Sequence, residues 1–527
     1  MGKPTNGFRV LVTTFLLLAL IAICNALSLA EAQEEEKKLE ELMRVKKNKP
    51  GKNKPRLYAT QHQVETLPGQ FEGDLLITPE QAERIKQETG KNVPAFFRKK
   101  RSYVAQKRKA MRDTNSHWKM GIVPYVFSSS IAPQGQENIK KAMKHWEEHT
   151  CIRFRPYTSA LMQWLQHDDY VDFYNGTGCH SHVGRIGGKQ EISIGLYCDS
   201  MLGTIVHEIG HALGFYHEQS RPDRDSFVNV KLENVLPGRA GNFEKYGRDE
   251  INDGNVPYDL GSVMHYGSSE FANGDKLTVE TRDKEMQNVV GQRIGLSFYD
   301  IKLANQMYKC DAHCNSNIKC ENGGFIGPDC NCKCPHGLGG PFCNDINRAD
   351  VPCGGVYAAS EGTIQTPNFP SNYMDSTTCY WLIKAPIGSK IQLTFQHFDI
   401  ELDQLDNGRY ECGYDWVEIR KYGPEKAGPR FCGRQKEGQT EIYNVNNLLI
   451  KFASDSDYNN QGFQAKYKII PGTQGASAGG WTAFSAWTQC PVTCGGGIQV
   501  RMRTCLPPGN TCPGKDLEFL RCNVNPC

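Results

Sequence analysis

The spacing of hydrophobic and polar positions divides the chain into segments of different kinds. An apolar run, VLVTTFLLLALIAIC, begins at Val10, and a highly charged segment with few aromatic residues follows at 31–55. Between residues 353 and 468, short runs such as KIQLTFQHFDI and YDWVEIRKY alternate apolar and polar positions between turn residues. Alternation with a period of two predicts half-buried strands, and a series of such strands predicts an all-β sandwich.

The first apolar run is typical of a secretory signal peptide, which we assign to 1–30. Lys3 and Arg9 precede the run and small residues follow it at Ser28–Ala30, which is the order of regions in such a peptide. A signal anchor that remains in the membrane is the alternative, but the run contains two threonines and is short for a span. No later segment is apolar enough to cross a bilayer. We expect an exported protein with no membrane attachment after the signal is removed.

Composition narrows the remaining possibilities. A length of 527 residues predicts about three or four folded units. The 61 Lys and Arg residues nearly balance the 58 Asp and Glu residues, so the formal charge of +3 gives no argument for a nucleic-acid partner. Of the 21 cysteines, Cys24 lies in the signal peptide, which leaves 20. An even number in an exported chain favours full pairing as disulfides.

The segment at 31–108 has the features of a removable pro-segment. Its first part is too charged to fold, TPEQAERIKQETG at 78–90 predicts a weak helix, and the basic run RKKR occupies 98–101. Basic runs are usually just exposed loops, but in an exported chain RKKR is also a cleavage sequence for secretory-pathway convertases. Lys107 and Arg108 form a second basic site. We therefore expect an activating convertase to cut at Arg98–Arg101.

Metal-binding residues are concentrated in HEIGHALGFYHEQSRPDRD, which begins at His207. On a helix, His207 and His211 project from the same face and are spaced to bind one ion. Gly214 lets the helix end and the chain turn, so that His217 can return as a third nitrogen ligand. Glu208, beside the first ligand, is placed to take a proton from a metal-bound water. Solvated histidines on an ordinary helix are the alternative.

Three neutral imidazoles with one open position are typical of catalytic zinc, whereas structural zinc sites fill all four positions, usually with thiolates. Zinc in such a site lowers the pKa of water, and Glu208 can accept the proton and later pass it to the leaving amine of a cleaved peptide. The pattern therefore predicts a zinc-dependent peptide hydrolase.

Further along the chain, SVMHYG contains Met264 and Tyr266. Together with HEIGHALGFYHE it resembles the astacin family of metzincin proteases. The resemblance implies zinc ligation by the three histidines and catalysis by Glu208. It also implies that Met264 is the apolar floor beneath the metal, and that Tyr266 is an extra ligand that swings off to hydrogen-bond the transition state. An ordinary packed tyrosine is the alternative for Tyr266.

The pro-segment carries FEGD at 71–74, which alone would be a glycine turn with a solvated carboxylate. The astacin resemblance gives it another role, because pro-segments of that family place the aspartate of an FxGD motif on the catalytic zinc. This implies that Asp74 is a zinc ligand in the latent form only. Gly73 would let the backbone pass close to the cleft wall, and Phe71 would anchor the segment in an apolar subsite.

The resemblance covers 109–310, from KAMRDTNSHWKMGIVPYVF to NQMYKC. It implies the disulfides Cys151–Cys310 and Cys179–Cys198, and it implies that Glu218 receives the new amino terminus after activation. That terminus follows either Arg101, with trimming, or Arg108. Asn175 begins an NGT glycosylation sequon, which is expected on the surface of an exported domain.

Three smaller modules are expected after the protease domain. The cysteine-rich stretch at 311–347 contains CENGG and CPHGLGGPFC and so resembles an EGF-like module. A zinc knuckle is disfavoured because closely spaced cysteines pair in an oxidising compartment. Residues 353–468 contain CGGVY, TPNFPSNY, YDWVEI and SDSDYNNQGFQAKY and resemble a CUB domain. A linker at 471–480 leads to WTAFSAWTQCPVTCGGGIQVRMRTC, with which 481–527 resembles a thrombospondin type-1 repeat. The resemblance implies the disulfides Cys314–Cys330, Cys320–Cys332, Cys334–Cys343, Cys353–Cys379, Cys412–Cys432, Cys490–Cys522, Cys494–Cys527 and Cys505–Cys512.

Two of these modules depart in part from their family patterns. Glu401, Asp415 and Asp455 match the calcium ligands of some CUB domains, but the insert LDQLDNGRYE lies between the first two. Calcium binding is therefore left open. In the repeat, Phe484 replaces the middle tryptophan, which leaves glycosylation of Trp481 in doubt. The residues that match the alternating stack of Trp and Arg side chains are Trp481, Trp487, Arg501 and Arg503.

The sequence thus predicts a multidomain α+β protein, a secreted astacin-type zinc metalloendopeptidase made as a zymogen and acting in the extracellular matrix. The module order resembles nematode astacins, and RKKR with this tail resembles the cuticle procollagen C-proteinases. We expect C-terminal processing of procollagen, with hatching or moulting as alternatives within the group. Arg293 in GQRIG is the candidate base of an S1′ pocket that attracts an acidic residue. The competing class is a matrix-binding protein with an inactive protease domain, although every expected zinc and catalytic residue is present.

Overall fold

The computed structural model describes most of the chain after residue 115 and a short part of the pro-segment. The described residues are 72–78, 81, 116–195, 198–246, 256–314, 318–347, 353–404, 410–472, 480–481, 485, 487–490, 492–494, 497–506 and 517–523. The predicted signal peptide, Phe71, the basic cleavage sites, Phe484 and most of the linker lie outside them. The chain forms two compact units: Met1–Cys314 with Gly327–Asp329, and Asn315–Ile326 with Cys330–Cys527. We describe each unit by itself.

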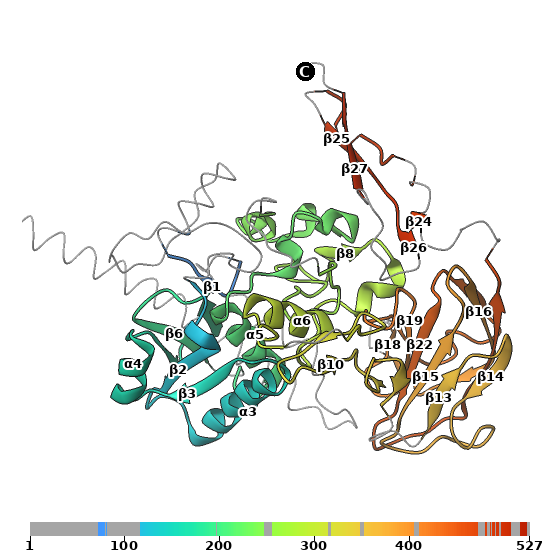
Figure 1. Cartoon of the computed structure of the whole chain (residues 1–527), viewed down its shortest axis with the longest axis horizontal. Helices are drawn as coiled ribbons and strands as arrows, with labels where there is room; N and C mark the ends of the chain where they lie inside the picture. Colours follow the sequence, from blue (N-terminus) through green and yellow to red (C-terminus); the bar gives the residue numbers. More distant parts are fainter. Residues whose placement is uncertain are drawn as a thin grey trace, which may run out of the picture. The chain divides into compact units, whose positions relative to one another are not determined.

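A six-stranded sheet, blue to teal in Figure 1, belongs to the first unit. Its strand order is β1-β5-β6-β4-β2-β3, and all neighbours pair in parallel except β5 with β6. The edge strand β1 belongs to the predicted pro-segment, so that segment extends the sheet of the domain it precedes. The strands are β1 (Leu75–Leu76), β2 (Ile122–Phe127), β3 (Arg153–Pro156), β4 (Tyr170–Tyr174), β5 (Cys179–His182) and β6 (Lys189–Ile194).

Helix α5 is the central element of this unit, and it packs against α3, β5 and β6. Each of its residues from Gly203 to Ala212 is buried, including the polar Thr204, His207, Glu208 and His211. Two tryptophan indoles hold it: Trp146 donates to the Val206 carbonyl at 3.1 Å, and Trp118 donates to the Ala212 carbonyl at 2.8 Å. The helices are α3 (Pro133–His149), α4 (Ser159–Leu165), α5 (Leu202–Ala212) and α6 (Phe298–Met307).

The chain reverses directly after α5. Gly214 adopts a φ of 108°, a conformation that is costly for residues with a Cβ, and it carries the chain into the short helix η3 (Glu218–Ser220). The strands β7 (Val228–Val230) and β8 (Val279–Thr281) pair beyond it. Two disulfides cross-link the unit: Cys151–Cys310 and Cys179–Cys198.

The second unit contains a β-sandwich at 353–472, the arrangement that the alternating pattern predicts. One sheet has the order β13-β15-β22-β19-β20 and the other β14-β23-β16-β21, with a shared core that includes Trp381, Phe395 and Phe463. The strands are β13 (Gly354–Tyr357), β14 (Glu361–Gln365), β15 (Thr378–Lys384), β16 (Lys390–Asp399), β19 (Trp416–Arg420), β20 (Arg430–Phe431), β21 (Thr440–Tyr443), β22 (Asn447–Ala453) and β23 (Gly462–Ile470), with β17 (Asp403–Gln404) and β18 (Tyr410–Glu411) in a small hairpin beside them.

Short strand pairs and disulfides make up the flanking modules. Before the sandwich, β9 (Phe325–Ile326) pairs with β10 (Cys332–Lys333), and β11 (Leu338–Gly339) pairs with β12 (Asp345–Ile346). After it, β24 (Gly480–Trp481) pairs with β26 (Cys505–Leu506), and β25 (Gly497–Met502) pairs with β27 (Leu517–Cys522). The disulfides of this unit include Cys320–Cys332, Cys334–Cys343, Cys353–Cys379, Cys412–Cys432 and Cys490–Cys522.

Three predicted disulfides remain predictions. Cys314 and Cys330 are both disulfide-bonded. Cys512 and Cys527, the predicted partners of Cys505 and Cys494, lie outside the described residues.

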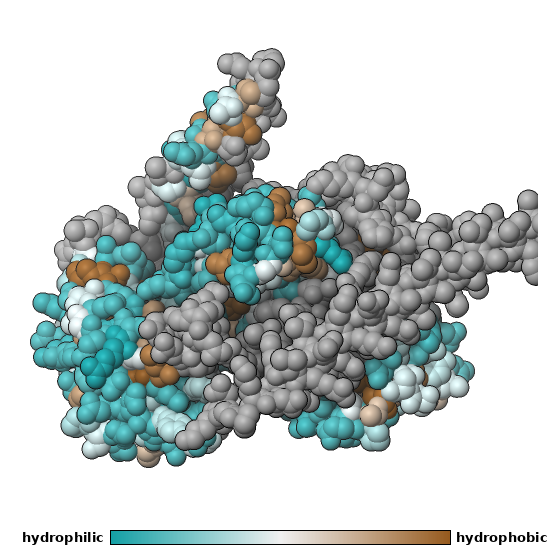
Figure 2. All heavy atoms as spheres, turned by 180° about the vertical axis from the view of Figure 1, so that it is seen from behind, coloured by the Kyte–Doolittle hydropathy of each residue, from teal (hydrophilic) through white to brown (hydrophobic). Residues whose placement is uncertain are grey.

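The surface agrees with an apolar interior. On the face seen in Figure 2 the coloured residues are mostly hydrophilic, and the hydrophobic ones form separate patches. Among the helices in the described part of the chain, none is both long enough and apolar enough to span a bilayer.

Candidate metal centre

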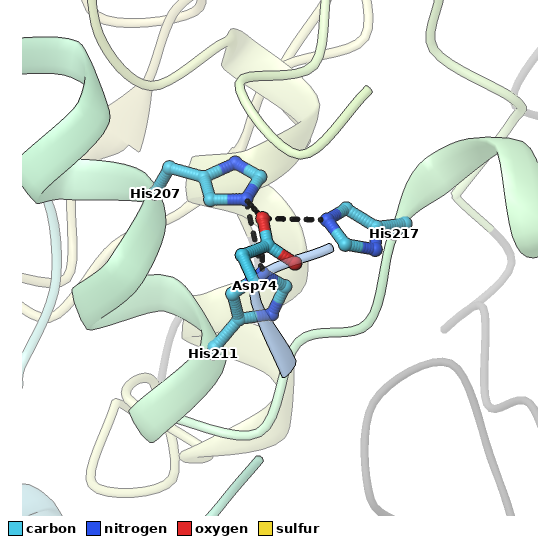
Figure 3. A group of neighbouring side chains, drawn as sticks. All are labelled: Asp74, His207, His211 and His217. Atoms are coloured by element: carbon cyan, nitrogen blue, oxygen red, sulfur yellow. Dashed lines mark hydrogen bonds and ion pairs between the residues drawn. The ribbon is translucent and has the colours of Figure 1, made fainter. Parts of the chain in front are cut away.

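Three histidines of the first unit converge on one point, as the sequence spacing predicts. His207 and His211 lie one turn apart on α5, and His217 reaches the same point after the reversal at Gly214 (Figure 3). All three side chains are completely buried. Their ring nitrogens, together with a carboxylate oxygen of Asp74, lie within 4.8 Å of one another.

The hydrogen bonds on the far side of the rings show what this point can hold. His207 Nδ1 donates to the Val263 carbonyl and His211 Nδ1 donates to the Phe215 carbonyl, each at 2.8 Å. Because a carbonyl only accepts, each neutral ring must carry its lone pair on Nε2. These two Nε2 atoms are only 2.9 Å apart, a separation at which two lone pairs need either a shared proton or a metal ion between them. Three imidazoles and one carboxylate oxygen suit zinc.

Asp74 comes from the predicted pro-segment and lies at the centre of the histidines. Its Oδ2 is 3.1 Å from His207 Nε2, 3.2 Å from His217 Nε2 and 3.7 Å from His211 Nε2, and Figure 3 shows it facing all three rings. Burial opposes the charge on Asp74, but the histidines outweigh burial and hold the pKa of Asp74 well below its usual range. Its Oδ1 is buried and has no hydrogen-bond partner among the described residues, so the carboxylate can also bind a metal ion through this oxygen.

The histidine that follows the turn is the most strongly affected by the pro-segment. His217 Nδ1 donates to the Glu72 carboxylate at 2.6 Å while its Nε2 faces Asp74. Burial disfavours a charged ring, but the two carboxylates outweigh burial and raise the pKa of His217 to about 10.

The pro-segment also closes the edge of the sheet next to the histidines. The Ser181 amide donates to the Asp74 carbonyl at 3.0 Å, and His182 Nδ1 donates to the Leu76 carbonyl at 3.0 Å. The side-chain amide of Gln81 donates to the Val183 carbonyl at 3.2 Å. These bonds place the chain along β5, next to the strand's end nearest Asp74 and the histidines.

The predicted catalytic residues surround the same point. Glu208 is buried on α5 between the two helical ligands. Tyr266 is 3 % exposed, its ring lies 4.6 Å from the His217 ring, centre to centre, and its hydroxyl donates to the Glu72 carbonyl. Met264 is buried, and a Cβ added to Gly210 would lie 2.8 Å from its Sδ. The methionine therefore packs against the underside of the helix that carries the first two histidines.

A second layer of polar groups supports this turn. Asp300 accepts from the Ser262 hydroxyl at 2.6 Å and from the Val263 amide at 2.9 Å, which fixes the carbonyl that orients His207. Glu218 is fully buried, where it accepts from Arg221 Nη1 at 3.2 Å and from the Asp259 amide at 2.9 Å. The role of Glu218 as partner of a new amino terminus stays a prediction, because both basic cleavage sites lie outside the described residues.

Sequence reasoning missed Glu72, Ser220, Gly210 and Asp300. Glu72 lies inside the FEGD motif, but nothing local indicates its contact with His217, 145 residues away. Ser220 donates to the other oxygen of Glu72 at 2.9 Å. Their contacts depend on elements that meet only in the folded domain, so no sequence pattern marks them.

The remaining predicted residues lie elsewhere. Arg293 is only 4 % exposed and donates to the His265 carbonyl at 3.1 Å, so it is not a solvated loop arginine. Asn175 is exposed, as a glycosylation site requires. In the second unit, carboxylate oxygens of Glu401, Asp415 and Asp455 lie within 4.8 Å of one another.

The thrombospondin-like region shows one of the stacked pairs that the sequence predicts. The Arg501 guanidinium lies 4.6 Å from the centre of the Trp487 ring, a distance typical of a cation–π contact.

Three family profiles match the chain in the order that the sequence suggests. The profile of the Astacin peptidase family matches residues 110–309, the CUB domain matches 353–467, and the thrombospondin type 1 domain matches 482–527. The first match contains every residue of the histidine cluster except Asp74.

Similar proteins occur in sea urchins and nematodes. Protein SpAN of Strongylocentrotus purpuratus is 42 % identical over 411 residues, which are 77 % of this chain and 64 % of that protein. This chain thus spans somewhat less than two thirds of the length of the sea-urchin relative. The zinc metalloproteinase nas-36 of Caenorhabditis briggsae is 35 % identical over 87 % of this chain and 74 % of its own length.

A second nematode relative matches a similar share of the chain. The zinc metalloproteinase dpy-31 of Caenorhabditis elegans is 32 % identical over 87 % of this chain and 75 % of its own length. These nematode proteins match along most of their length, and the histidine cluster has the donor set of catalytic zinc. The chain belongs to the astacin family of zinc metalloendopeptidases.

Proposed function

We propose that this protein is a secreted zinc endopeptidase that is made as an inactive precursor and processes proteins of the extracellular matrix. The observation that carries the proposal is the position of Asp74. A carboxylate from the segment that precedes the domain faces three buried imidazoles, and the same segment covers the edge of the sheet. Such an arrangement is expected of a protease held inactive until that segment is removed.

The residues around the cluster can perform peptide hydrolysis. Zinc, when bound by the three histidines, supplies a lowered water pKa and polarisation of the scissile carbonyl. Glu208 takes the proton of the attacking water and then passes it to the leaving amine. The Tyr266 hydroxyl, once the Glu72 carbonyl has left, can donate a hydrogen bond to the negative charge that develops on the substrate oxygen.

Activation follows from removal of the pro-segment. Cleavage by a convertase at Arg98–Arg101 frees the segment, and Asp74 leaves the histidines with it. The new amino terminus, after Arg101 with trimming or after Arg108, would then form an ion pair with Glu218. The mature domain in this proposal comprises residues 109–310, followed by the EGF-like module at 311–347.

We propose procollagen as the substrate, with C-terminal processing during cuticle formation as the reaction. The support is the resemblance of RKKR and of the module order to cuticle procollagen C-proteinases. The alternative is a protease of the same architecture and chemistry that acts in hatching or moulting. In each case the CUB domain and the thrombospondin repeat would hold the enzyme on the matrix, and Glu401, Asp415 and Asp455 would bind calcium within the CUB domain.

Substitution of the proposed base tests the function directly. Glu208→Gln should keep bound zinc, because all histidines remain, and should lower turnover by roughly 10²–10⁴-fold through loss of the base. Zinc content is measured in the same preparation as peptide cleavage. A zinc-replete Glu208→Gln enzyme with near-normal turnover would contradict the mechanism, and a wild-type enzyme without turnover would favour the matrix-binding alternative.

The substrate needs its own experiment. Matrix is incubated with activated wild-type enzyme or with Glu208→Gln, and new protein termini are identified. Termini at the C-propeptide boundary of collagens, found only with the wild type, support procollagen processing. If Arg293 supplies positive charge to the S1′ pocket, a peptide library should show Asp or Glu just after the cut, and Arg293→Gln should remove that preference. A wild-type enzyme without acidic preference would refute this role of Arg293.

A further inference from the structure

The three histidines differ in where their outer hydrogen bonds go. His207 and His211 donate to backbone carbonyls of the protease domain itself. His217 instead donates to a carboxylate, at 2.6 Å, and that carboxylate belongs to Glu72 of the pro-segment. Proteolytic removal of the pro-segment would therefore leave two outer acceptors in place and take away the third.

Glu72 is firmly held in this position. Glu72 is buried, including its whole side chain. The Ser220 hydroxyl donates to the second carboxylate oxygen of Glu72 at 2.9 Å. The Tyr266 hydroxyl donates to its backbone carbonyl at 2.5 Å. The backbone has a φ of 50°, which non-glycine residues adopt only when the surroundings enforce it. Glu72 is thus fixed from both its side chain and its backbone, with one oxygen directed at His217.

A carboxylate acceptor has a defined effect on a histidine that binds a metal. It holds the proton on Nδ1, keeps the ring in one orientation, and makes Nε2 more basic, and loss of such a partner typically weakens metal binding about 10–100-fold. A charged acceptor is also a stronger partner than a carbonyl. The third histidine follows the turn at Gly214 and lies outside α5, so its orientation depends most on such a partner.

We propose that Glu72 is a positioning residue for zinc: it orients His217 in the precursor and increases zinc retention, and activation lowers zinc affinity by removing it. Asp74 blocks the site, whereas Glu72 acts through His217 from the opposite side of the ring. The proposal rests on the zinc assignment of the proposed function and is independent of the substrate.

The test is zinc affinity of the full-length precursor, with both basic sites made uncleavable, measured by competition with a chelator. Glu72→Ala should raise the zinc dissociation constant about 10–100-fold. Glu72→Gln, which keeps an acceptor oxygen without its charge, should give an intermediate value. Gln81→Ala is the matched control, because Gln81 holds the same segment to Val183 without contacting a histidine, and it should leave zinc affinity unchanged.

A second comparison separates Glu72 from Asp74. The Asp74→Ala precursor keeps Glu72, whereas the mature enzyme lacks both residues, so the Asp74→Ala precursor should bind zinc roughly 10–100-fold more tightly than the mature enzyme. Cleavable versions of all variants yield the same mature polypeptide, which must then show the same zinc affinity and activity. This identity also shows that each precursor folded correctly.

The outcomes are distinct. If Glu72→Ala and Glu72→Gln precursors bind zinc as tightly as the wild type, Glu72 has no role in retention and the proposal is wrong, although the zinc protease assignment stands. If Gln81→Ala weakens binding as much as Glu72→Ala, the effect comes from loosening of the segment and the proposal is also wrong. A wild-type precursor that binds no zinc would overturn the proposed function itself.

Discussion

Gly210 lies directly against the Met264 thioether: a Cβ on Gly210 would be 2.8 Å from Sδ and 3.4 Å from the Trp146 ring. The first distance is far below an ordinary contact with a carbon atom, and the second is already at the short limit of van der Waals contact. The methionine floor and the zinc-binding helix are therefore in contact at the one helical position between the two histidines that has no side chain.

This contact predicts an unusual sign for a helix substitution. Gly→Ala in a helix interior normally stabilises by about 1 kcal/mol, but overpacking costs about 1–3 kcal/mol. Gly210→Ala should therefore destabilise the protease domain by up to about 2 kcal/mol. In a Met264→Ala background the obstruction is gone, and Gly210→Ala should stabilise instead. Calorimetry of the protease transition measures the stability change caused by Gly210→Ala in both backgrounds. A change of the same sign with Met264 and with Met264→Ala would contradict the contact.

Tyr266→Phe tests the transition-state role of the hydroxyl. In the mature enzyme we expect kcat to fall roughly 10²–10³-fold, as for loss of one oxyanion donor, with little change in KM. Tyr308→Phe is the control, since it also removes a buried hydroxyl, one that donates to the Leu213 carbonyl, and it should leave kcat unchanged. A loss confined to KM would assign Tyr266 to substrate binding.

Asp74→Ala tests zinc ligation as the cause of latency. With both basic sites made uncleavable, the precursor should gain measurable peptidase activity or cut its own pro-segment, because water can then occupy the open position. Asp74→Asn should give a smaller gain, since its amide oxygen is a weaker ligand. A double variant as silent as the Asp74-intact precursor would show that strand β1 blocks the site sterically, without help from the carboxylate.

Asp259 and Asp300 are two buried carboxyl groups close to the turn that contains Met264, and they predict that stability depends on pH. Burial, with the nearby charge of Asp300, raises the pKa of Asp259 to about 7. Because the folded pKa exceeds the unfolded one, the stabilisation is fully present below about pH 4 and is lost as pH rises to about 7, by up to roughly 1.4 kcal/mol per pH unit. Asp259→Asn keeps an acceptor for the Gly261 amide but cannot ionise.

Calorimetry from pH 4 to pH 8 checks this sign. The transition temperature of the wild-type protease domain should fall with rising pH relative to that of Asp259→Asn. The two temperatures should converge at the acid end of this range. Parallel curves would show that the pKa of Asp259 is the same in the folded and unfolded states, which would contradict this prediction. Chelation of zinc identifies which transition belongs to the protease domain.

Calcium binding by the CUB domain predicts a stability change in the second unit. Asp415 accepts from the Tyr373 hydroxyl at 2.6 Å and from the Asp455 amide at 2.7 Å, which fixes one carboxylate beside the other two. For a dissociation constant of about 10⁻⁴–10⁻³ M, 10 mM calcium should stabilise the domain by roughly 1.4–2.7 kcal/mol. Asp415→Asn should abolish the shift and the exposed Asp457→Asn should not. An unchanged wild-type transition would argue against the site.

The sequence by itself determined the chemistry of the site. His207, His211 and His217 are close in the chain, and their spacing follows from the helical repeat and from a glycine that can reverse the backbone, so local geometry brings them together. The alternating pattern likewise predicted the sandwich, because half-buried strands need one apolar face. Both features depend on residues within a few positions of each other.

The tertiary structure decided what controls that site. Glu72 and Asp74 meet His217 across more than 140 residues, and Gly210 meets Met264 across more than 50. No periodicity links such positions, because their approach depends on how the pro-segment pairs with β5 and how the turn packs beneath α5. The FxGD resemblance already assigned Asp74 to the metal, whereas the contact of Glu72 with the other side of the His217 ring is seen only in the folded protein.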